Sequence, residues 1–420
     1  MGGASRAEDP VAGPPPSAGP EVAPGADAQA AFEQGERTRA ARATVRRVEA
    51  MLEQRPNDAM LQYYLAMFHA QAGDRAEALN GLRKVAERHL GFHPTAGDGF
   101  EPLRRDAEFQ EILTGIEAKE PKVLGAAEAF HLPDPRFIPE GIAYDAKKQR
   151  FFIGSVAQRR IIERTRDGKF VDFATESDGL KSVLGLRVDA ERRLLYAVST
   201  NAFAHSADES LENWLYVYDL ETRKLKGRYL AIEAISFNDV AVGPAGEVVL
   251  TDAAAGAVYR LDSTLGELIL VAPPGAVSSA NGIDFAPDGK RVFVAGATGI
   301  VTVDLQSGRY ERMPQPDNIA AGALDGLYFH DGALIGIQNV ICPGRVVRLT
   351  LDPEARKITG LEVLQAYHPL LDEPTTGAIV ADSVFVIANS FVGRVAEDRS
   401  LRDAATLRPT TVLKVPLHRS

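Results

Sequence analysis

The phrase Glu140-Gly-Ile-Ala-Tyr-Asp decides the fold, because related phrases recur along the rest of the chain. The later copies are Leu184-Gly-Leu-Arg-Val-Asp, Asn238-Asp-Val-Ala-Val-Gly, Asn281-Gly-Ile-Asp-Phe-Ala, Asp325-Gly-Leu-Tyr-Phe-His and Thr376-Gly-Ala-Ile-Val-Ala. The six starts lie 44, 54, 43, 44 and 51 residues apart. Repeats of about 40–50 residues, each with several short strands, are typical of β-propeller blades.

The residues around each phrase complete the pattern of a blade. A turn such as Pro287-Asp288-Gly289 follows the phrase and leads into a second apolar strand. The last repeat is short of one strand, which residues 122–131 can supply from ahead of the first repeat. This closes the ring and removes exposed sheet edges. The sequence therefore predicts a mainly β protein, with residues 122–420 forming a six-bladed β-propeller.

Residues 35–119 show helical spacing instead and predict a small all-α domain. Pro56-Asn57-Asp58 provides a break and a helix cap. The stretch from Ala59, with a turn at Gly73, resembles a tetratricopeptide repeat. A stable array needs about three such repeats and one is visible, so we expect a helical cap docked on the propeller. A groove for a protein partner is the alternative.

Residues 1–34 are rich in Pro, Gly and Ala and are expected to be disordered. No signal peptide is expected in the sequence, and this segment leaves both an exported mature form and a cytoplasmic protein open. The net charge of −10 argues against nucleic-acid partners, and no stretch is apolar enough for a membrane span. With Cys342 as its only cysteine, the chain can form neither an internal disulfide nor a cysteine-based zinc site.

Four of the six phrases begin with an oxygen-bearing side chain. These are Glu140, Asn238, Asn281 and Asp325. The innermost strands of a propeller begin at one end of its channel, so these side chains should converge on the axis. Two carboxylates facing each other there would repel and lose solvation unless a cation compensated them. Two carboxylates and two amides suit Ca²⁺ or another hard divalent cation, and a water-filled channel without metal is the alternative.

Glycine follows the first residue in five of the six phrases and should let neighbouring backbones approach closely. The exception is Asp239, an additional carboxylate beside the expected site.

Residues 130–417 resemble the senescence marker protein (regucalcin)/gluconolactonase family. The resemblance rests on motifs that occur here in the family's order: Pro139-Glu140-Gly141, Phe237-Asn238-Asp239, Asn281-Gly282 followed by Pro287-Asp288-Gly289, and Asp325-Gly326. It implies a six-bladed propeller with calcium or a similar ion on the axis, and hydrolysis of lactones or related esters. It also implies Glu140, Asn238, Asn281 and Asp325 as metal ligands, with Asp325 as the general base.

The sequence departs from the family pattern in the substrate region. Ser236 stands where the family often places an arginine that contacts a sugar acid, and Val240 replaces a glycine. Val183-Leu184 stands where the related paraoxonases have a histidine. These departures place a sugar-acid lactone in doubt as the substrate.

The expected function is metal-dependent hydrolysis of a small-molecule lactone or ester, in which Asp325 or Asp239 takes a proton from water. The alternative is a propeller that binds a ligand or protein around a structural calcium. The long loops 199–213 and 388–410 are expected to wall the substrate pocket. His205, Asn339 and Asn389 are the candidate pocket residues.

Overall fold

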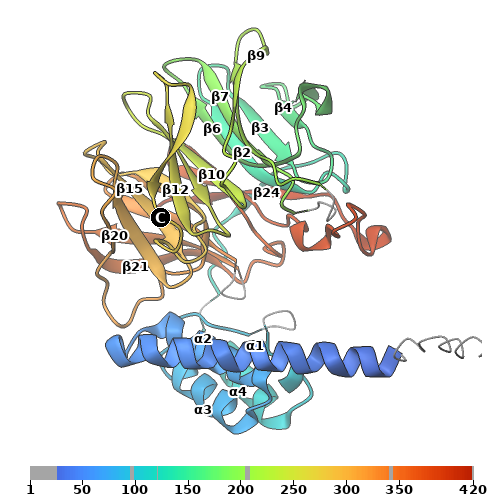
Figure 1. The fold of residues 1–420 in the computed structure, drawn as a ribbon, viewed down its shortest axis with the longest axis vertical. Helices are drawn as coiled ribbons and strands as arrows, with labels where there is room; N and C mark the ends of the chain where they lie inside the picture. The colour runs from blue at the N-terminus through green and yellow to red at the C-terminus, as the bar shows by residue number, and fades with distance from the viewer. Residues whose placement is uncertain (1–25, 95–98, 121, 204–208, 340–343, 419–420) are drawn as a thin grey trace, which may run out of the picture.

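The computed structural model describes residues 26–94, 99–120, 122–203, 209–339 and 344–418, with side chains from residue 34 on. Most of the chain forms a ring of six four-stranded antiparallel sheets, with a helical domain against one side of the ring (Figure 1). The predicted fold class is therefore confirmed. None of the described helices combines the length and the apolar character needed to cross a membrane.

The first three blades follow one another along the chain. Blade one contains β2 (Pro139–Asp145), β3 (Arg150–Ser155), β4 (Ile161–Arg164) and β5 (Phe170–Ala174). Blade two contains β6 (Ser182–Asp189), β7 (Leu194–Thr200), β8 (Asn213–Asp219) and β9 (Leu225–Leu230). Blade three contains β10 (Phe237–Val242), β11 (Val248–Asp252), β12 (Ala257–Asp262) and β13 (Glu267–Ala272).

The other three blades complete the ring. Blade four contains β14 (Ile283–Phe285), β15 (Arg291–Gly296), β16 (Gly299–Asp304) and β17 (Tyr310–Arg312). Blade five contains β18 (Leu324–His330), β19 (Ala333–Gln338), β20 (Arg345–Leu351) and β21 (Ile358–Ala366). Blade six contains β22 (Gly377–Val380), β23 (Ser383–Ile387), β24 (Thr411–Pro416) and, from the start of the domain, β1 (Ala127–His131).

The ring closes as the sequence predicts. Strand β1 pairs antiparallel with β24, with Ala127 opposite Lys414 and His131 opposite Thr411. First strands of adjacent blades contact one another, as β2 does with β6 and β22 and β14 does with β10 and β18, so these strands surround the axis. Alternating apolar side chains fill the space between successive sheets, for example Phe293 and Leu334 between blades four and five.

The helical domain contains α1 (Ala26–Gln54), α2 (Ala59–Ala72), α3 (Arg75–Ala86) and α4 (Ala107–Glu117). Asp58 caps α2 by accepting a hydrogen bond from Leu61 N at 3.1 Å, and Gly73 ends that helix with φ of 82°, as predicted. The expected boundary at residue 35 is too late, because α1 begins at Ala26. Within residues 1–34 the last proline is Pro24, and the residues after it are mostly the good helix formers Ala, Gln and Glu.

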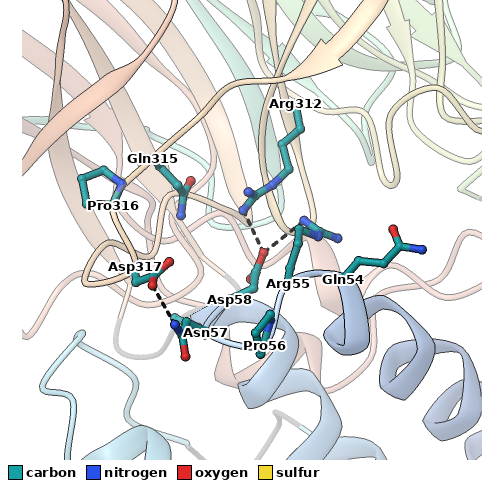
Figure 2. A pocket seen from close by; sticks show the side chains of 10 residues that line it. Gln54, Arg55, Pro56, Asn57, Asp58, Arg312, Gln315, Pro316 and Asp317 are labelled. Atoms are coloured by element: carbon teal, nitrogen blue, oxygen red, sulfur yellow. Dashed lines mark hydrogen bonds and ion pairs between the residues drawn. The ribbon is translucent and has the colours of Figure 1, made fainter.

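The helical domain docks on blades four and five. The Tyr64 hydroxyl donates a hydrogen bond to Ala297 O at 3.1 Å, and Ala320 and Ala323 of the propeller join the helical core. Figure 2 shows the polar edge of this contact, where Arg312 on β17 lies 2.9 Å from Asp58. The helical domain thus docks on the propeller, as the sequence predicts.

We expect Arg312→Met to loosen the docked helices. The Asp58 side chain is only 3% exposed, so losing this partner leaves its charge less compensated and should cost about 2 kcal/mol. Hydrogen exchange should be faster in α2 than in the unaltered protein. Arg192→Met removes an ion pair within blade two and is the control. Equal exchange in both variants would contradict a stabilising role for the Arg312 contact.

Candidate metal centre on the propeller axis

The four predicted ligands lie at the axial end of the innermost strands of blades one, three, four and five. Strand pairing shifts register between Pro139 and Ile142, between Phe237 and Val240, and between Leu324 and Leu327. Each shift spans a ligand position. A bulge of this kind re-aims a side chain that a regular strand would point elsewhere. Local backbone geometry thus departs from a regular strand at three of the four predicted ligands, and the charge of Asp325 acts on Glu140.

Backbone strain accompanies three of the four ligands. Ile138, Ser279 and Ala323 have φ values of 47°, 53° and 55°. Each stands two residues before a ligand, at Glu140, Asn281 and Asp325 respectively. Positive φ is rare for residues other than glycine, above all for β-branched isoleucine, and costs about 1–3 kcal/mol. Positive φ thus recurs at equivalent positions of three blades, directly ahead of the predicted ligands.

The glycine after a ligand lets one blade touch the next, as predicted. A Cβ on Gly141 would lie 1.9 Å from Leu184 O, and a Cβ on Gly282 would lie 2.3 Å from Asp325 O. The backbone of one phrase therefore packs directly on the backbone of the next. This contact sets how close the ligands come to one another.

Each of the four side chains keeps one buried oxygen without a hydrogen-bond partner. These atoms are Glu140 Oε2, Asn238 Oδ1, Asn281 Oδ1 and Asp325 Oδ1. Buried polar atoms are normally paired, since leaving one unpaired costs about 1–3 kcal/mol. Four unpaired oxygens at equivalent positions of four blades fit a bound cation, which would satisfy them together.

The charges at this end of the channel are strongly perturbed. Burial, followed by the charges of Asp325 and Asp239, raises the pKa of Glu140 well above its ordinary range. Burial and the charge of Asp239 raise the pKa of Asp325 to about 7. Hydrogen bonds from Asn339 and Asn281 act in the opposite direction and lower this pKa. Within the described residues, no three His, Cys, Asp or Glu side chains form a group that could hold a metal, so the two amides are essential to the set.

Asp239 has a different role from the four ligands. Its Oδ1 accepts from Val240 N at 2.8 Å and its Oδ2 accepts from Ile283 N at 3.3 Å. The carboxylate therefore joins the inner strands of blades three and four. Burial raises its pKa to about 6, although the charge of Arg187 opposes this.

Residues below the site were missed from the sequence. Arg187 of blade two donates from Nε to Val240 O and from Nη2 to Ile283 O, both at 3.2 Å. Its guanidinium carbon lies 5.3 Å from the centroid of the Tyr328 ring. The signal was a charged residue at the fourth position of two phrases, Arg187 in blade two and Asp284 in blade four, which lie 4.0 Å apart.

The three predicted pocket residues differ in where they lie and what they contact. Asn339 donates from Nδ2 to Asp325 Oδ2 at 2.6 Å and so contacts the ligand set directly. Asn389 is 1% exposed, accepts from Thr411 N and donates to Pro409 O, so it orders a loop. His205 lies outside the described residues.

A cavity of about 520 Å³ opens beside the site, and Asn281 and Asn339 line it. None of the described residues of loops 199–213 and 388–410 lines this cavity, so a substrate pocket walled by these loops stays a prediction. The opposite wall comes instead from α1 and α2, because the helical domain occupies the space over blades four and five.

Sequence comparison places this site within a known family. Residues 138–351, just over half of the chain, match the family described as the SMP-30/gluconolactonase/LRE-like region. The chain belongs to this family. All four predicted ligands fall within the matched residues. No curated protein sequence matches the chain.

Solved structures with a similar fold are distant in sequence. A gluconolactonase from Xanthomonas campestris shares 15% identity over 70% of this chain and 99% of its own, with a TM-score of 0.45. Virginiamycin B lyase from Staphylococcus aureus shares 13% over 70% and 99%, with a TM-score of 0.45. A luciferin-regenerating enzyme shares 14% over 69% and 95%, with a TM-score of 0.47.

We expect the metal-free protein to lose stability as the pH rises from about 4 to 7. Asp325 and Asp239, with pKa values of about 7 and 6, bind protons more tightly when folded than when unfolded. Urea unfolding of chelator-treated protein at pH 5 and pH 7.5 should show a loss of about 4 kcal/mol from these groups. Glu140→Gln/Asp325→Asn should flatten the trend, and an unchanged slope would contradict the assignment.

We expect Gly282→Ala to destabilise the ring by about 3 kcal/mol or more, because the new methyl group would overlap Asp325 O and Leu327 N. Urea unfolding measures this loss. Gly115→Ala is the control: nothing lies within 4 Å of its Cβ position in α4, so it should be neutral or stabilising. Similar stability of Gly282→Ala and the unaltered protein would contradict the close approach of blades four and five.

Proposed function

We propose that the protein hydrolyses lactones or esters with the help of Ca²⁺ or another hard divalent cation. The observation that carries the proposal is the set of four buried oxygens, from two carboxylates and two amides, that no protein group satisfies. Membership of the SMP-30/gluconolactonase/LRE-like family supports lactone hydrolysis as the reaction class. The cavity next to Asn281 supplies room for a small molecule.

Glu140, Asn238, Asn281 and Asp325 would hold the cation. When bound, the cation supplies a Lewis acid for the substrate carbonyl. Glu140 and Asp325 would balance its charge, which removes the cost of burying two carboxylates together. Arg187 keeps a positive charge below the site and ties blade two to blades three and four.

Asp325 is the better candidate for the general base. Asn339 orients its Oδ2 with a hydrogen bond of 2.6 Å, and Asn339 also lines the cavity in which a substrate would lie. Asp239 is less suited, because both of its oxygens already accept backbone N–H groups. We therefore assign proton transfer to Asp325 and a positioning role to Asp239.

The reaction balances without an oxidant or reductant. A water oxygen bonds to the carbonyl carbon while Asp325 accepts the proton of that water. The C–O bond to the ring oxygen or alcohol then breaks, and the proton passes from Asp325 to the leaving oxygen. The products are a hydroxy acid from a lactone, or an acid and an alcohol from an ester.

Calorimetric titration of chelator-stripped protein with Ca²⁺ tests the first half of the proposal. We expect saturable one-to-one binding, weakened at least about 100-fold in Glu140→Gln/Asp325→Asn, because each lost charge-assisted contact is worth about 1.5–3 kcal/mol. Glu267→Gln/Glu311→Gln removes two exposed carboxylates from outer strands and should bind normally. A folded protein that binds no divalent cation would contradict the proposal.

Hydrolysis of a panel of lactones and esters at saturating Ca²⁺ tests the second half. Turnover by the unaltered protein should fall at least about 100-fold in Asp325→Asn with the fold intact. Calcium binding without turnover of any substrate would instead indicate a propeller that binds its ligand around a structural ion.

A further inference from the structure

The cavity of about 520 Å³ lies between the two domains, and most of its walls are apolar. Helix α1 contributes Val48 and Met51, and α2 contributes Leu61 and Phe68. On the propeller side, Ala323 and Leu324 are apolar, whereas Ser278, Ser279 and Thr298 bring hydroxyl groups to the floor. Cavities that bind small molecules typically measure about 300–1,000 Å³ and have such walls with a few polar groups.

The cavity adjoins the axial site at two residues. Asn281, one of the four proposed ligands, is part of its lining. Asn339 also lines it and donates a hydrogen bond to Asp325. A molecule whose carbonyl group lies at the axial oxygens would therefore extend its substituent into the space beneath α1 and α2.

We propose that this cavity binds the apolar alkyl or aryl substituent of the substrate, so that the protein prefers hydrophobic lactones or esters to sugar-acid lactones. The proposal rests on the proposed function and names the substrate class of the same site. The helical domain thereby supplies half of the specificity pocket, while the propeller supplies the reacting groups.

The polar groups of the cavity argue against a polyhydroxylated substituent. The Tyr64 hydroxyl already donates to Ala297 O, and Asn339 Nδ2 already donates to Asp325. Arg47 and Thr44 lie toward solvent and are bonded to each other at 3.3 Å. The remaining hydroxyl groups, on Ser278, Ser279 and Thr298, all lie on the propeller side. Sugar hydroxyl groups against the wall formed by Val48, Met51, Leu61 and Phe68 would lose water with few partners in return, which selects against them.

The docking contacts hold this pocket in place. The Tyr64 hydrogen bond fixes α2 over blade four, and the ion pair between Asp58 and Arg312 anchors the start of that helix (Figure 2). Met51 and Met67 belong to the wall, and flexible methionine side chains adapt to substituents of different shape. A range of alkyl groups should therefore be accepted.

The test is a series of γ-lactones with no, two, four or six alkyl carbons, alongside glucono-δ-lactone, using the full chain with saturating Ca²⁺. We expect kcat/KM to rise about fourfold for each buried CH₂ group until the cavity is full. Glucono-δ-lactone should be at least about 100-fold poorer than the lactone with four alkyl carbons.

A matched pair of double variants locates the effect. Met51→Gln/Phe68→Gln places polar groups in the cavity wall, so kcat/KM should depend less on alkyl chain length. For the longest lactone, kcat/KM should fall about tenfold or more. Leu52→Gln/Leu65→Gln changes one residue on each of the same helices, but both residues face a different groove. In this variant kcat/KM should therefore depend on alkyl chain length as it does in the unaltered protein.

Several outcomes would overturn the proposal while leaving the hydrolase intact. These are a rate independent of alkyl length, a preference for glucono-δ-lactone, or equal effects of the two double variants. If no lactone is hydrolysed, the proposed function fails, and calorimetry with the unreactive γ-lactams of the same alkyl lengths tests the cavity separately. Affinity that rises with chain length and is lost in Met51→Gln/Phe68→Gln would support it, and affinity independent of length would overturn it.

Discussion

Electrostatic compensation at the propeller axis is the constraint on which the rest of the structure depends. Glu140 and Asp325 are both almost fully buried, and each presents an oxygen with no partner in the protein. Burial alone would favour neutral carboxyl groups, as the raised pKa values of both residues show. The cation that we propose would reverse that preference, and the buried, unpaired amide oxygens of Asn238 and Asn281 fit such an ion better than apolar side chains would.

The backbone is arranged to meet this constraint. Register shifts span three of the predicted ligands, residues with positive φ precede three of them, and Gly141 and Gly282 let adjacent blades touch. Asp239 reinforces the contact between blades three and four through two backbone N–H groups. These features cost conformational free energy in the innermost strands, and the contacts between blades of the closed ring offset that cost.

Much of this could be predicted from the sequence because the propeller is a repeat. Glu140, Asn238, Asn281 and Asp325 occupy one position in a recurring phrase, and equivalent positions of a closed ring must converge. The strand that closes the ring was predictable for the same reason. The start of α1 was not, because a few helix-forming residues after Pro24 were hidden in a segment of biased composition.

The sequence by itself therefore determined the propeller, the order of its blades and the identity of the axial side chains, since periodicity encodes all three. Only the tertiary structure decided what lies over the site. Val48 and Phe68 belong to helices whose spacing shows an apolar face but not its partner, and contacts such as Tyr64 with Ala297 span over 200 residues. Such contacts carry no local pattern, so the pocket, the role of Arg187 and the unpaired axial oxygens became visible only in three dimensions.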